Sequence, residues 1–105
     1  MLSDQERLVK LGRYIKEQRT IRNMSTYYIE NAYGVDRALW SKLETGKLTS
    51  MPKPEFLLKL SLILSLNVIK LYIILGYLTE NDVQEFMSDS HRLKEQDYRR
   101  ISLKP

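Results

Sequence analysis

The sequence predicts an all-α fold, with a five-helix domain in residues 1–78 and a short helical tail in residues 79–105. The chain has 105 residues, a length that suits a single hydrophobic core. Only four glycines and three prolines interrupt it, which favours helices over a turn-rich β protein. Apolar residues also recur at helical spacing, as Leu8, Leu11 and Ile15 do, so these segments have one face to bury.

The first two helices have clear start signals. Ser3 to Glu6 has the form of a capping box, in which the Glu6 side chain reaches back to the Ser3 backbone. This helix should run to about Arg19. Ser25 is the N-cap candidate of the second helix, which should stop at Gly34, because glycine adopts the left-handed conformation common after a helix C-terminus.

The next three helices follow at short intervals. Asp36 is expected to cap the third helix, which ends at Gly46. Pro54 suits the first turn of a fourth helix, which should end near residue 64. A fifth helix is expected over 68–75.

The tail begins with Thr79 and Asp82, which should cap a sixth helix. Three apolar residues share one face of this helix: Val83, Phe86 and Met87. A break is expected at 88–90, followed by a charged helix or frayed end over 91–101. The apolar face, with Leu93 beyond it, either packs on the fourth and fifth helices of the same chain or forms half of a symmetric dimer contact.

A long apolar run, residues 56–78, approaches the length that spans a bilayer. Lys59 and Lys70 lie within it, and each would cost about 2.5–3.5 kcal/mol near a bilayer centre. Asn67 separates two helical patterns and makes a good N-cap for the second. We therefore expect two buried helices and no membrane span.

Composition limits the classes of function. The formal net charge is +4, and residues 1–78 carry the basic excess, with twelve Lys and Arg against seven Asp and Glu, which favours an anionic partner. The absence of cysteine excludes disulfides, cysteine-based zinc sites and thiol catalysis. His91 stands alone without a nucleophile or a second metal ligand, so we expect no enzyme, metal or cofactor. No apolar signal segment is visible at the N-terminus, which leads us to expect a cytoplasmic protein.

The third helix, over 36–45, is the candidate for binding. A tight turn centred on Gly34 sets two helices at a steep angle. Four apolar residues should then point inward: Ile29, Val35, Trp40 and Leu43. One exposed ridge is left: Arg37, Ala38, Ser41 and Lys42. A helix about 10–12 Å across fits the DNA major groove, where Arg and Lys donate to guanine and alanine can touch a thymine methyl.

Residues 11–77 resemble the Cro/lambda-repressor-like helix-turn-helix family, also called the XRE family. The matching stretches are LGRYIKEQR, MSTYYIENAYGV and WSKLETGK, and the most specific is the S-K-L-E-x-G-K run after Gly34. The resemblance implies a five-helix fold that binds double-stranded DNA and regulates transcription.

The resemblance also implies roles for individual residues. Phosphate contacts are expected at the start of the second helix and in the loop after the third: Ser25, Thr26, Thr45 and Lys47. Tyr27 could donate to phosphate as well. The base-reading positions hold Arg37, Ala38 and Lys42, with Ser41 at the edge of the ridge. Arg19 and Glu44 match a buried structural ion pair, which fixes orientation more than it adds net stability.

One residue departs from the family pattern. Glu30 stands where the family has a small residue, usually alanine, and an unpaired carboxylate between crossing helices would be costly. Either the helices cross more widely here, or Glu30 extends towards Arg37 or Arg22.

Two functions from different classes follow. The first is a sequence-specific DNA-binding repressor that acts as a homodimer on an operator of two half-sites. The alternative is a protein-interaction module of the same fold, of the antitoxin or antirepressor type, that acts through its apolar tail. The sequence identifies no small-molecule or protein effector.

Overall fold

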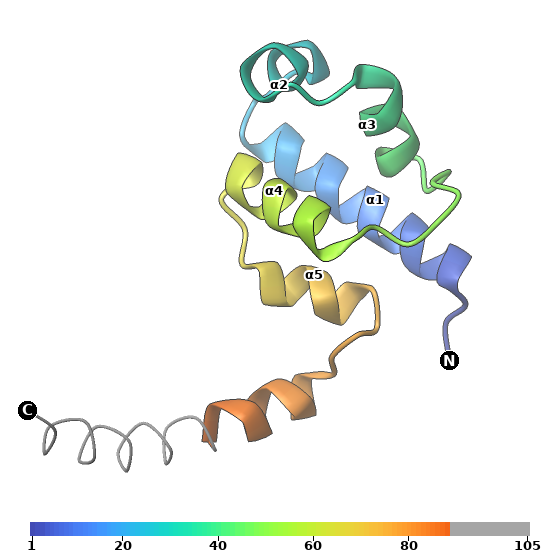
Figure 1. Cartoon of the computed structure of the whole chain (residues 1–105), viewed down its shortest axis with the longest axis vertical. Helices are drawn as coiled ribbons and strands as arrows, with labels where there is room; N and C mark the ends of the chain where they lie inside the picture. The colour runs from blue at the N-terminus through green and yellow to red at the C-terminus, as the bar shows by residue number, and fades with distance from the viewer. Residues whose placement is uncertain (89–105) are drawn as a thin grey trace, which may run out of the picture.

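A computed structural model describes residues 1–88, and within this range the chain is helical with no strand, so the all-α prediction is confirmed there (Figure 1). The helices are α1 (Asp4–Ile21), α2 (Thr26–Tyr33), α3 (Arg37–Glu44), α4 (Pro54–Leu64) and α5 (Val68–Ile74). Residues 80–88 form a further helix. None of the helices in the described range is long and apolar enough to cross a membrane. The predictions for 89–105, including those for His91 and Leu93, lie outside the described residues.

The first two helices begin at the predicted N-caps, and the second ends at the predicted glycine. The Ser3 Oγ accepts a hydrogen bond from the Glu6 backbone N–H at 3.1 Å, and the Glu6 carboxylate accepts one from the Ser3 N–H, also at 3.1 Å. The Ser25 Oγ accepts from the Tyr28 N–H at 2.9 Å. Gly34 ends α2 with a φ of +70°, the left-handed conformation that favours glycine.

The later helices are capped in the same way. The Asp36 carboxylate accepts from the Ala38 N–H at 2.6 Å, and the Asn67 side chain accepts from the Ile69 N–H at 3.0 Å. Thr79 and Asp82 exchange two hydrogen bonds at the start of the helix over 80–88. The boundaries differ little from the predicted ones: α1 continues to Ile21, and α5 ends at Ile74.

The core is shared by all five labelled helices. The four residues predicted to point inward from α2, α3 and their turn are buried, and Trp40 is fully enclosed. They pack against buried residues of the other helices: Leu8, Leu11, Ile15, Leu57, Leu60, Ile63, Leu64, Leu71, Ile74 and Leu75. Gly12 lets α1 approach α3 closely, because a Cβ there would meet the Glu44 carbonyl oxygen at 2.7 Å.

The helix over 80–88 lies at the end of the molecule opposite α2 and α3 (Figure 1). Val83 is half-buried, but Phe86 and Met87 are exposed at 69% and 64%. Within the described residues these two side chains therefore do not pack on α4 or α5. The dimer alternative stays a prediction.

Candidate nucleic-acid interface

The predicted ridge lies on the outer side of α3. This helix has eight residues, and its inner side supplies Trp40 and Leu43, which are 0% and 1% exposed. Every residue predicted for DNA contact on α3 and in the following loop is exposed: Arg37, Ala38, Ser41, Lys42, Thr45 and Lys47. The three cationic residues of this set therefore lie on a surface that a ligand could reach.

The turn between α2 and α3 fixes where this ridge stands. No atom lies within 4 Å of the position that a Cβ on Gly34 would occupy, so space is not the reason for glycine there. The reason is the positive φ, which other residues adopt only with strain. Val35 follows directly and is 3% exposed, so the turn is anchored in the core.

The start of α2 is suited to an anion. The Ser25 Oγ already accepts a hydrogen bond from the Tyr28 N–H. The backbone N–H groups of Thr26 and Tyr27, in contrast, have no hydrogen-bond partner among the described residues. No acidic residue lies in the first turn of α2. Free N–H groups and the helix dipole together favour negative charge at this point. Thr26 is half-buried and Tyr27 is 58% exposed.

The start of α3 differs, because protein carboxylates already occupy it. Asp36 accepts hydrogen bonds from the Ala38 and Leu39 N–H groups, and Glu30 accepts one from the Arg37 N–H at 3.0 Å. A phosphate would meet two negative charges there. The structure therefore offers free backbone donors at the start of α2 and not at the start of α3.

Glu30 adopts the second of its two predicted arrangements, with Arg37 as its partner. The Glu30 Oε1 lies 3.2 Å from the Arg37 Nε, and the two side chains are 36% and 55% exposed. The Arg37 guanidinium also lies 5.4 Å from the centre of the Tyr27 ring. Arg22 instead donates to the Gln18 side chain at 2.7 Å.

A buried ion pair ties α1 to the end of α3. The Arg19 Nε lies 2.5 Å from the Glu44 Oε2, and the Arg19 Nη2 donates to the Glu44 Oε1 at 3.0 Å. The side chains are only 17% and 8% exposed. Glu44 also accepts from the Trp40 indole N–H at 2.6 Å, and Arg19 donates to the Met24 carbonyl at 2.8 Å.

The same contact favours the charged form of the arginine. The hydrogen bond to the Glu44 carboxylate raises the pKa of Arg19 above its ordinary value, although partial burial opposes the rise.

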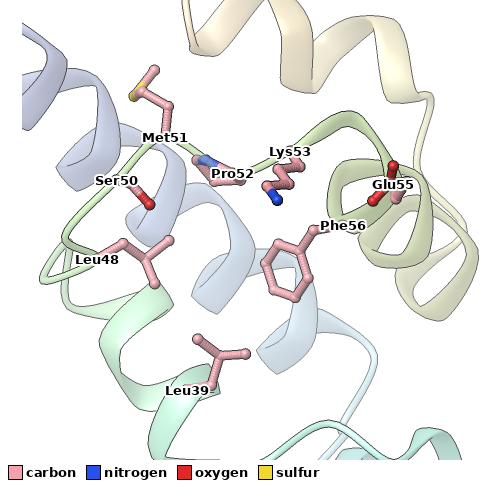
Figure 2. A pocket seen from close by; sticks show the side chains of 8 residues that line it. All are labelled: Leu39, Leu48, Ser50, Met51, Pro52, Lys53, Glu55 and Phe56. Atoms are coloured by element: carbon pink, nitrogen blue, oxygen red, sulfur yellow. The ribbon is translucent and has the colours of Figure 1, made fainter.

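An apolar hollow of about 230 Å³ lies beside α3 and was not predicted from the sequence. Figure 2 shows Leu39, Leu48 and Phe56 facing it from α3, the following loop and α4. Leu39 is 40% exposed on the same helix as the cationic ridge. One feature of the sequence could have pointed to this hollow. Leu39, next to Trp40, is apolar but is not among the residues predicted to point inward.

Within residues 1–88, no group of three or more His, Cys, Asp or Glu residues is placed to hold a metal ion. No protein-family model, curated protein or solved structure matches the chain.

Proposed function

We propose that the protein is a sequence-specific regulator of transcription that binds double-stranded DNA through α3, in the manner of the lambda-repressor-like helix-turn-helix family. The observation that carries the proposal is the division of α3 into a buried side and an exposed cationic side. Trp40 and Leu43 fix the helix to the core, while Arg37 and Lys42 face outward. A helix of this diameter fits the major groove.

Each part of the surface has a role in this complex. Arg37 and Lys42 donate to the O6 and N7 atoms of guanine, and Ala38 contacts a thymine methyl. Thr45 and Lys47, in the loop after α3, contact phosphate. The free N–H groups at the start of α2 receive a phosphate of the other strand.

The proposed unit on DNA is a homodimer. One such domain reads only a few base pairs, and operators commonly contain two half-sites about one DNA turn apart. Phe86 and Met87 supply exposed apolar surface beyond α5, where a second copy would bury it. Occupancy of the operator is then enough to block transcription, so the protein acts as a repressor in the cytoplasm.

The direct test is selection of bound duplexes from a random pool with the full chain. We expect an enriched sequence made of two half-sites with centres about 10 bp apart, bound with an affinity that falls steeply as salt rises. Arg37→Ala should relax the preference at one base pair of each half-site. Absence of both enrichment and salt-sensitive binding would refute the proposal.

A second candidate is a protein-interaction module of the same fold. The exposed Phe86 and Met87, together with the hollow beside Leu39, favour it, because solvated apolar groups of this size often mark contact surfaces. The double variant Phe86→Ser/Met87→Ser separates the two. A DNA regulator whose copies pair through this helix should lose dimerisation and bind single half-sites, whereas a module of the second kind shows no DNA binding before or after the change.

A further inference from the structure

Glu30 makes two contacts with the same residue of the neighbouring helix. Its Oε2 accepts a hydrogen bond from the Arg37 backbone N–H at 3.0 Å, and its Oε1 lies 3.2 Å from the Arg37 Nε. Capping of α3 alone does not explain why residue 30 is a glutamate. Asp36 already binds two other N–H groups at the start of α3.

The arginine is held on two sides but keeps its outer donors. The Glu30 carboxylate lies beside its Nε, and the Tyr27 ring lies 5.4 Å from the guanidinium carbon. Neither Nη atom of Arg37 has a hydrogen-bond partner among residues 1–88. The Arg37 side chain is 55% exposed, so these Nη groups remain available to a ligand. An arginine fixed in this way presents its planar pair of Nη groups in one orientation. Fewer side-chain rotamers then have to be restricted when a ligand binds.

Resting on the DNA-binding function proposed above, we propose that Glu30 is a positioning residue that pre-orders Arg37 for reading one base pair. The carboxylate has a second, opposite effect, because a negative charge at this surface repels phosphate. Glu30 therefore lowers affinity for DNA of any sequence while it raises discrimination at the base pair that Arg37 reads. A residue with only a structural role would not change general affinity and discrimination in opposite directions.

The test compares the full-length protein with Glu30→Gln. The Arg37→Ala variant first identifies the base pair that loses its preference in duplex selection. Binding of the wild type and of Glu30→Gln is then titrated against the selected operator and against the same operator changed at that base pair. Glu17→Gln is the matched control, because it removes an equal charge from an exposed site on α1.

The expected result is a drop of about 3- to 10-fold in discrimination for Glu30→Gln, the range that corresponds to ordering one long side chain. Its affinity for unrelated duplex should rise at the same time. Glu17→Gln should change no preference. Glu30→Asp keeps the charge but shortens the reach, so it should lose discrimination without gaining general affinity.

The contrary outcomes are distinct. If the wild type selects no sequence, the proposed function and this inference both fail. If it selects an operator but Arg37→Ala relaxes no base pair, the base-reading role proposed for Arg37 and this inference both fail. If Arg37→Ala relaxes a base pair but Glu30→Gln discriminates as the wild type does, only the inference is overturned. A parallel loss of affinity for every duplex would assign Glu30 to the fold and would also overturn it.

A second measurement does not depend on DNA. ¹⁵N relaxation of the arginine Nε groups should show Arg37 restricted in the wild type and mobile in Glu30→Gln. Arg13 is the internal reference, because it is exposed and has no ion pair within the described residues. An Arg37 as mobile as Arg13 in the wild type would contradict the pre-ordering.

Discussion

Replacing Arg19 with methionine should remove a large part of the stability of the domain. Methionine keeps much of the length of arginine but cannot pair with the Glu44 carboxylate, whose side chain is only 8% exposed. That carboxylate would retain one neutral donor, the Trp40 indole N–H at 2.6 Å. Leaving one partner of a buried ion pair unpaired typically costs about 3–5 kcal/mol.

This loss is large compared with the unfolding free energy of the whole domain. A domain of this size has an unfolding free energy of about 5–15 kcal/mol. Each kcal/mol shifts the Tm of a small domain by about 4–8 °C, so Arg19→Met should lower it by about 12 °C or more. Urea unfolding followed by circular dichroism measures the free energy, and a thermal scan measures the Tm.

Two further variants separate the free-energy cost of the unpaired buried charge from the cost of simply losing contacts. Arg19→Met/Glu44→Gln removes both charges and keeps an acceptor for Trp40, so it should recover at least half of the lost free energy. Arg37→Met breaks a half-exposed ion pair and should cost about 1 kcal/mol or less. If Arg19→Met costs no more than Arg37→Met, or the double variant recovers nothing, the reasoning from the stranded carboxylate is wrong.

Three other predictions concern separate parts of the molecule. Gly12→Ala should lower the unfolding free energy by about 1–3 kcal/mol, because the new methyl group meets backbone carbonyls of α3, while Lys16→Ala on the exposed side of α1 should change urea unfolding little. The Ser3 backbone N–H lowers the pKa of Glu6 below its ordinary value of 4.5, so the stability that this cap contributes is present above pH 4.5 and is lost as pH falls through the lowered value. An NMR titration should find the Glu6 midpoint below 4.5, and Glu6→Gln should remove the matching pH-dependent change in the Ser3 amide chemical shift. Lys47→Ala should weaken binding to all duplexes alike and reduce the salt slope by about 1, whereas a sequence-dependent loss would place Lys47 at a base.

The helices were predictable because their signals are local. Ser3, Ser25, Asp36 and Asn67 cap helices within a few residues of themselves, and each makes the expected hydrogen bond. Gly34 ends α2 through its own φ. Such features depend on neighbours in the chain, so the sequence contains them directly.

The contacts between helices were only partly predictable. The Arg19–Glu44 pair was expected from family resemblance, but the Trp40 donor to the same carboxylate was not, because it depends on how the indole lies in the core. For Glu30 the sequence left open whether the helices cross more widely or the side chain extends towards Arg37 or Arg22, and only side-chain geometry selects Arg37. The hollow beside Leu39 arises from three separate segments, so no single stretch of sequence predicts it.

The shortness of α3 has a consequence for how the protein works. An isolated peptide of eight residues does not hold a helix in water, because forming the first turn is unfavourable and too few further residues follow to compensate. The exposed ridge of α3 therefore exists only while Trp40 is enclosed in the core. Under the DNA-binding function proposed above, a substitution that opens the core should abolish binding as completely as one in the ridge, and a bound duplex should raise the melting temperature of the whole domain.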